Sequence, residues 1–188
     1  MNYAGFWPRL CALLLDMLFL MPLLGIVYWG GERSRLFDAY WFAPNQLIGI
    51  WYSIYLVQRF GGTPGKRVMG LSIVKLDGSR IGYREAILRN LPDLVMSVAS
   101  GLALMSAVIH MSDAQYFSAG YIERQKLIQS AAPAWYSWVV IASNAWIWSE
   151  FVVMLTNRKR RALHDFMAGT AVVRQVPVAE STPVSQPG

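Results

Sequence analysis

Three carboxylates stand out in this sequence because they lie within or at the ends of long apolar runs: Asp16, Asp93 and Glu150. Moving an ionised carboxylate into hydrocarbon costs roughly 2.5 kcal/mol or more, so each should face a basic partner, another polar group or water. A carboxylate that reaches water can alternate between protonated and charged forms, or it can bind a cation. The three residues are therefore candidates for ion handling.

The same carboxylates have basic neighbours that would give them a structural role instead. Arg9 and Asp16 are seven residues apart and fall on one face of a helix, while Arg89 and Asp93 are four apart and could pair directly. Fixed ion pairs and hydrogen bonds of this kind set the register between helices. The residue types leave both interpretations open.

Four membrane-spanning helices are predicted to position these residues. The sequence of 188 residues is 55% hydrophobic, which exceeds what an ordinary soluble core requires. A helix needs roughly 20 mostly apolar residues to cross about 30 Å of hydrocarbon, and the runs of that length are 10–29, 39–58, 91–111 and 134–155. We therefore expect an all-α membrane protein with one domain over residues 1–174. Residues 175–188, with repeated prolines and no apolar pattern, are expected to form a disordered cytoplasmic tail.

The distribution of basic residues predicts the orientation of the chain. Lys and Arg close to a span resist translocation. The N-terminal segment, the 59–90 loop and the segment after the last span together carry 13 Lys and Arg, whereas the other two loops carry 4. This bias predicts that both chain ends and the 59–90 loop lie in the cytoplasm.

The 59–90 loop is predicted to form a small cytoplasmic β-hairpin between the second and third helices. Residues 68–76 are β-prone, Asp77-Gly78 is a strong hairpin turn, and residues 80–83 can return. The β-prone stretch 169–173 could add to that hairpin. The outer segment 112–133 could hold a short helix around 121–128, or it could be a loop.

Two basic clusters beside predicted spans are candidates for contact with anionic lipid headgroups. One follows a glycine-rich turn that lacks the pattern of a phosphate loop, and the other directly follows the fourth run. Their residues are Lys66, Arg67, Arg158, Lys159, Arg160 and Arg161. A tight turn with solvated charges would explain the first cluster equally well. Because the formal charge of +6 is dispersed beside apolar runs, a lipid surface is favoured over nucleic acid as the partner.

The residue types give little support to metal, cofactor or enzyme chemistry. His110 and His164 fall at opposite ends of predicted spans, about a bilayer thickness apart, which argues against a shared metal or haem site. Cys11 is the single cysteine, so it has no partner for a disulfide or a zinc site. No Ser, Cys or paired Asp pattern matches an intramembrane hydrolase. We expect no cofactor, no metal and no enzymatic activity.

Three segments together resemble the RDD family of membrane proteins in both order and spacing. They are RLCALLLD at 9–16, GTPGKRVMG at 62–70 and RALHDFMAGT at 161–170, and the resemblance covers residues 5–174. It implies that Arg9, Asp16 and Asp165 occupy the positions of the Arg and the two Asp behind the family name. It also implies a transport-related role in a bacterial inner membrane, without defining a reaction.

Placing the family residues on the predicted topology divides them into two groups. Arg9 and Asp165 both fall at the cytoplasmic boundary, which predicts an ion pair that ties the first helix to the segment after the fourth. Arg9, Arg89 and Asp165 are therefore structural candidates, and Asp16 and Glu150 are the better candidates for ion handling.

Two functions remain open at this point. The first is a small transporter or transporter component for protons or monovalent cations, which would need to form an oligomer because four helices are few for a transport pathway. The alternative is an adaptor that transports nothing and holds another membrane protein through its hairpin, basic surface or outer segment.

Overall fold

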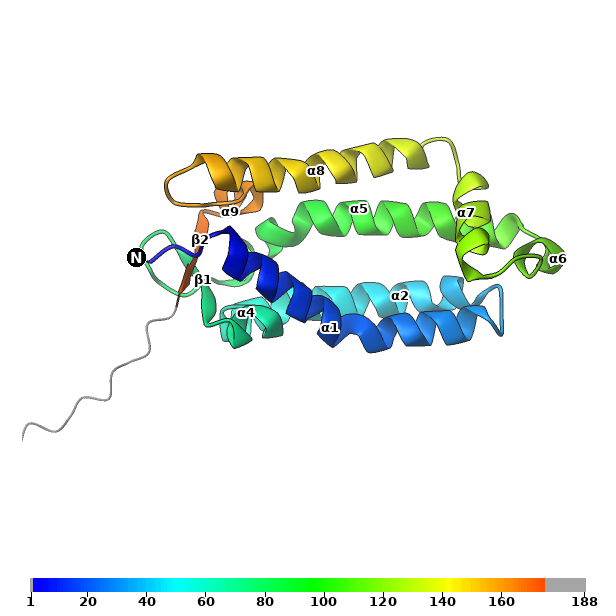
Figure 1. Ribbon diagram of the computed structural model, residues 1–188, viewed down its shortest axis with the longest axis horizontal. Helices are drawn as coiled ribbons and strands as arrows, with labels where there is room; N and C mark the ends of the chain where they lie inside the picture. Colours follow the sequence, from blue (N-terminus) through cyan, green and yellow to red (C-terminus); the bar gives the residue numbers. More distant parts are fainter. Residues whose placement is uncertain (1, 175–188) are drawn as a thin grey trace, which may run out of the picture.

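The computed structural model describes residues 2–174 of the chain, so the predicted disordered tail lies outside the described residues. Long helices dominate the structure (Figure 1). Three of them are long and apolar enough to cross a membrane: α1 (Phe6–Gly31), α5 (Tyr83–His110) and α8 (Tyr136–Thr156). Large apolar side chains are exposed along all three, as expected of helices that face lipid tails. The chain is therefore a helical membrane protein.

The second predicted span is helical, but it is interrupted. The α-helix α2 (Phe37–Ile50), the π-helix η1 (Trp51–Tyr55) and the α-helix α3 (Leu56–Phe60) follow one another directly. A π-turn breaks the regular i to i−4 hydrogen bonding and is frequently found at functional sites. Since none of the three segments is long enough to span by itself, the count of four spans and the inward orientation of both ends stay predictions.

The long helices pack around α5. It lies between α2 on one side and α8 on the other, and α1 packs against α2 and against the short helix α4 (Pro64–Val68) (Figure 1). The ends of α1 and α8 meet where the rings of Phe6 and Phe151 lie 5.8 Å apart, and the two helices diverge from there. This divergence leaves the space described below.

A two-stranded sheet joins the segment between α4 and α5 to the segment after α9 (Leu163–Met167), so the prediction that the strand of the 59–90 loop pairs mainly within that loop is wrong. Strand β1 (Leu71–Lys75) pairs antiparallel with β2 (Thr170–Arg174). The Asp77-Gly78 turn does form, but its return reaches β1 at one isolated bridge, between Val74 and Arg80. The distant strand is the better partner because its first three residues, Thr170 to Val172, are all buried, whereas Ser79 and Arg80 remain exposed.

The sheet closes one end of the bundle, which we call the sheet end. Strand β1 packs on a core built from η1, α1, the start of α5 and β2, with Ile54, Leu71, Ile73 and Val172 among its buried members. Helix α9 (Leu163–Met167) lies beside α8 and leads into β2.

The opposite end of the bundle, the α7 end, carries α6 (Asp113–Tyr116) and α7 (Tyr121–Ser130) (Figure 1). Helix α7 lies where the sequence indicated a short helix. It inserts Arg124, whose side chain is 2% exposed, into a salt bridge with Glu32 at the end of α1. A second salt bridge joins Arg35 to Asp113 at 2.7 Å. These two pairs hold the α6–α7 segment against the long helices.

Candidate functional site

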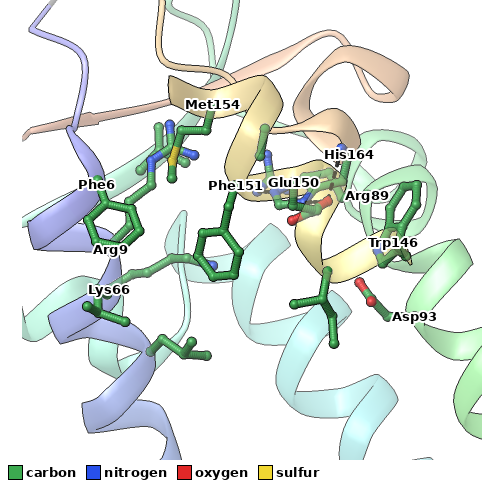
Figure 2. Close-up of a pocket in the computed structure, with 15 residues that line it drawn as sticks. Phe6, Arg9, Lys66, Arg89, Asp93, Trp146, Glu150, Phe151, Met154 and His164 are labelled. Atoms are coloured by element: carbon green, nitrogen blue, oxygen red, sulfur yellow. Dashed lines mark hydrogen bonds and ion pairs between the residues drawn. The ribbon is translucent and has the colours of Figure 1, made fainter. Parts of the chain in front are cut away.

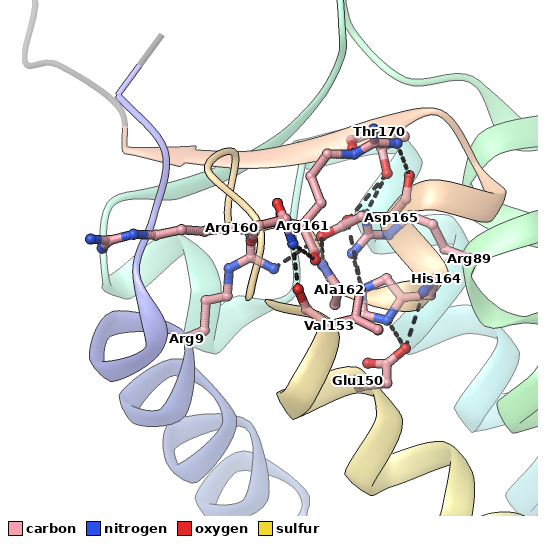
Figure 3. Close-up of polar contacts among 11 residues, drawn as sticks. Arg9, Arg89, Glu150, Val153, Arg160, Arg161, Ala162, His164, Asp165 and Thr170 are labelled. Atoms are coloured by element: carbon pink, nitrogen blue, oxygen red, sulfur yellow. Dashed lines mark hydrogen bonds and ion pairs between the residues drawn. The ribbon is translucent and has the colours of Figure 1, made fainter. Parts of the chain in front are cut away.

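Asp165 lies at the centre of a polar network at the sheet end (Figure 3). Its carboxylate is fully buried and accepts hydrogen bonds from Arg9 at 3.0 Å, from the backbone N–H of Ala162 at 3.0 Å and from Thr170 at 3.3 Å. Arg89 completes the shell with a salt bridge to the second oxygen. The predicted pair between Arg9 and Asp165 is present in the structure, whereas Arg89 pairs with Asp165 rather than with Asp93.

This shell keeps Asp165 charged. Burial by itself would raise the pKa of the carboxyl, but the charges of Arg89, His164 and Arg9 together with the Ala162 N–H lower the pKa well below its usual range. Two guanidinium groups and one carboxylate from α1, α5 and α9 therefore form a permanently ionised cluster. The arrangement suits a structural role because no lone pair of Asp165 remains free for another ligand.

A second chain of contacts runs from this cluster toward α8. Arg89 lies 2.7 Å from Nε2 of His164, and the other ring nitrogen of His164 contacts the carboxylate of Glu150. The backbone N–H of His164 also donates to Glu150 at 3.2 Å. Glu150 is therefore held by His164, a partner that sequence reasoning did not connect to it.

Asp16 is enclosed by donors from two segments that are distant in sequence. Tyr52 of η1 and Thr63 donate their hydroxyl groups at 2.5 Å, and the backbone N–H of Gly65 donates at 2.7 Å. The carboxylate is 8% exposed, and it contacts these three donors rather than Arg9. Asp16 thus joins α1 to η1 and to the turn before α4.

Gly65 has to be a glycine for this contact to form. A Cβ atom at this position would lie 2.2 Å from the backbone carbonyl oxygen of Ala12 and 2.8 Å from the carboxylate of Asp16. The side chain of Asp16 on α1 and the backbone of α4 are therefore in direct contact. The GTPG turn at 62–65 therefore serves the packing of α1 against α4.

Asp93 differs from the other acidic residues because it faces open space. It lines four pockets, three of them between the long helices and one between α5, α4 and α9, and it forms no salt bridge with any described residue. Its side chain points toward that of Trp146 on α8 (Figure 2). The predicted pair with Arg89 does not form because Arg89 is turned toward Asp165.

An inner pocket of about 280 Å³ lies beside Asp93 between α1, α2, η1 and α5. Its polar lining comprises the side chains of Asn45, Gln46, Tyr52, Ser53, Asn90, Asp93 and Ser97. Ser97 donates to Gln46 at 3.2 Å, and Ser53 donates to the backbone carbonyl of Gly49 at 2.6 Å. Asn45, Gln46 and Ser53 belong to the second apolar run, and the packing of α2 and η1 against α5 brings them to the same pocket as Asp93.

The predicted headgroup residues separate into exposed and buried groups. Arg67 is exposed, with its guanidinium 4.9 Å from the ring centre of Phe60, and Arg158, Lys159 and Arg160 are exposed after α8. Arg161 is 8% exposed and donates to the backbone carbonyls of Thr170 and Asp165. The prediction that Arg161 contacts headgroups is therefore wrong, because its charge is used to hold α9 against β2.

Lys66 also differs from a surface residue. It is half-buried and lines two of the pockets together with Asp93 and Arg89. Burial, followed by repulsion from Arg89, lowers the pKa of Lys66 to about 8. Over residues 2–174, no group of three His, Cys, Asp or Glu side chains is placed to hold a metal ion.

Comparison with known proteins supports the family resemblance of the sequence. The model of the family described as the RDD family matches residues 3–169. A protein of Bacillus subtilis (strain 168) with the name "Uncharacterized protein YckC" is 35% identical over 108 residues, which cover 56% of this chain and 70% of that protein. No solved structure matches the chain. The matched range contains Arg9, Asp16 and Asp165, the three residues around which the sheet end is built.

Proposed function

Because the chain belongs to the RDD family of membrane proteins, we propose that it is a transporter or transporter component for protons or a monovalent cation. In this proposal Asp93 is the carboxylate that handles the ion. The observation that carries it is the contrast in partners: Asp16 and Asp165 are enclosed by fixed donors, whereas Asp93 faces pockets and has no salt-bridge partner among the described residues.

The chemistry of the inner pocket supports a cation or a proton as the substrate. Amide, hydroxyl and carboxylate oxygens are the ligands that hard cations prefer, and this pocket offers them from α2, η1 and α5 around one acidic group. Such a carboxylate inside a membrane protein is by default a candidate for a proton or ion pathway. The π-helix beside it supplies Ser53 and breaks the regular helix at the depth of the pocket.

Asp93 also has neighbours on the sheet end that could pass an ion onward. One small pocket joins Asp93 to Asn90, Lys66 and His164, and Glu150 lies on the other side of His164. In the proposed pathway an ion enters the inner pocket, binds at Asp93 and leaves past His164 and Glu150. The role assigned to Asp16 at the sequence level thereby moves to Asp93.

The proposal includes a bacterial cell membrane as the location and an oligomer as the working unit. A single chain of this size offers few helices to enclose a pathway, so repeated copies would complete it.

Purified protein in sealed vesicles tests the transport proposal. We expect the wild type to support a pH change driven by a Na⁺ or K⁺ gradient, and Asp93→Asn to abolish it while the protein remains folded. Asp113→Asn is the matched control because Asp113 is an acidic residue at the α7 end, 75% exposed and outside the pockets. If Asp93→Asn transports as well as Asp113→Asn does, then Asp93 is not the ion site. If the wild type moves neither protons, Na⁺ nor K⁺, the adaptor alternative is favoured.

A further inference from the structure

A pocket of about 250 Å³ opens between α1 and α8 at the sheet end (Figure 2). Its outer part is apolar, with Phe6, Leu10 and Leu13 on α1 and with Ile147 and Phe151 on α8. Leu13 is 44% exposed and Ile147 is 51% exposed, so the mouth lies on the lipid-facing surface of the bundle. We call this space the lateral pocket.

The inner part of the lateral pocket is polar and carries three basic side chains, those of Arg9, Lys66 and Arg89. Arg9 and Arg89 both form salt bridges with Asp165. Two carboxylates also line the pocket, but Glu150 is held by His164 and Asp93 is turned toward Trp146 (Figure 2). Of these three basic side chains, Lys66 is the one that forms no salt bridge with any described residue.

Three donors in this pocket lack an acceptor. No carboxylate of the described residues lies within salt-bridge distance of Lys66, and the buried Nε of Arg9 and Nε1 of Trp146 have no hydrogen-bond partner. A half-buried ammonium group without an anion is costly in a low-dielectric site. The pKa of Lys66 is lowered because its charge is buried. An anion that enters the pocket would offset the cost of this buried charge.

We propose that the lateral pocket binds the headgroup phosphate of an anionic phospholipid, with Lys66 as its main contact and the acyl chains lying over the exposed apolar faces of α1 and α8. The pocket opens toward lipid through an apolar mouth, which a hydrated inorganic phosphate would have to cross. A net negative headgroup is required because its charge compensates that of Lys66, whereas a zwitterionic lipid brings an ammonium group together with its phosphate. Exposed Arg158, Lys159 and Arg160 near the same end add attraction for an anionic leaflet.

This proposal does not depend on transport. A phospholipid bound at Lys66 stabilises the contact between α1 and α8 whether or not Asp93 carries an ion. Binding can therefore be measured as thermal stability on protein that transports nothing.

The test is the melting temperature of the purified protein in a neutral detergent, titrated with phosphatidylglycerol, phosphatidylcholine or inorganic phosphate. We expect phosphatidylglycerol alone to raise the melting temperature of the wild type. Lys66→Gln should increase the phosphatidylglycerol concentration needed for half of this rise about tenfold or more, since one charge-assisted contact to the phosphate is lost. Lys66→Gln should also melt at a higher temperature than the wild type in the absence of anionic lipid, because the uncompensated charge is gone.

Lys126→Gln is the matched control, since Lys126 is a lysine of α7 at the opposite end of the bundle with a side chain that is 68% exposed, and it should leave the phosphatidylglycerol effect unchanged. Ile147→Trp provides a second variant, because it fills the mouth of the pocket from a site that is 51% exposed, with Ile141→Trp on a different face of α8 as its control. The proposal is overturned if Lys66→Gln and Ile147→Trp respond to phosphatidylglycerol as the wild type does. It is also overturned if inorganic phosphate or phosphatidylcholine gives the same gain, or if no lipid gives one.

Discussion

The Asp165 cluster lies at the sheet end of the bundle, the Asp93 pockets extend from it between the long helices, and both regions place a carboxylate among polar side chains. The two regions differ in how many hydrogen-bond and salt-bridge partners the carboxylate has. Asp165 accepts from two arginines, a threonine and a backbone N–H, whereas Asp93 faces pockets on several sides. A carboxylate whose oxygens all accept hydrogen bonds from the protein holds helices together, and one that lacks such partners is available to a ligand. The number and direction of the partners, more than depth in the bundle, separate the two roles.

The largest effect is expected when the charge of Asp165, the carboxylate with the full set of partners, is removed. Asp165→Asn should destabilise the protein by about 3–5 kcal/mol, because the buried charges of Arg9 and Arg89 lose their counter-ion. Chemical denaturation in detergent, followed by circular dichroism, measures the loss. Asp113→Asn removes one partner of an exposed salt bridge and should cost less than about 1 kcal/mol. Equal losses in the two variants would show that the Asp165 cluster does not stabilise the fold.

A smaller effect is expected where Asp16 holds the turn before α4. Gly65→Ala should cost about 1–3 kcal/mol, since its Cβ would overlap the backbone of Ala12 and push Asp16 away from its donors. Gly25→Ala is the control on α1, because nothing lies within 4 Å of its added Cβ, and it should be neutral or stabilising by up to about 1 kcal/mol. The same denaturation assay compares them. A neutral Gly65→Ala would contradict the close contact between α1 and α4.

Asp93→Asn tests whether the carboxylate that faces the pockets also stabilises the fold. Since Asp93 has no salt bridge to lose among the described residues, we expect its stability to stay within about 1 kcal/mol of the wild type, even where transport is abolished. A loss as large as that of Asp165→Asn would mean that Asp93 is a structural residue as well.

The smallest expected effect is a pH dependence that arises from Lys66. Its pKa is lowered to about 8 in the folded protein, so between that value and the ordinary lysine pKa the unfolded chain binds the extra proton. Stability should therefore rise with pH across this window. Melting temperatures measured from pH 7.5 to 10.5 in neutral detergent should show this rise for the wild type and a weaker one for Lys66→Gln. Identical slopes would remove Lys66 as the cause.

The site was predictable from sequence to different degrees. The pairing of Arg9 with Asp165 followed from their shared position at one membrane boundary, and the structure contains it. The proposed pair of Arg89 with Asp93 rested on helical spacing alone, and it does not form because Asp165 offers Arg89 a buried partner with two oxygens. Spacing along one helix cannot reveal a stronger partner on another element.

The strand pairing illustrates the same limit. Asp77-Gly78 correctly predicted a turn, and 169–173 correctly read as β-prone. The choice between a local hairpin and the distant β2 was decided by burial, because β2 brings Ala171 and Val172 into the core. A turn signal reports local backbone preference and carries no information on which strand covers the core better.

The sequence by itself determined that the chain is a helical membrane protein of the RDD family, since hydropathy and motif spacing are properties of the chain read in order. Only the tertiary structure decided which acids are enclosed and which face pockets. Hydrogen-bond partners such as Tyr52, Thr63 and Gly65 reach Asp16 from segments more than 30 residues away. The physical reason is that a carboxylate's role depends on the donors around it, and those donors are brought together by packing.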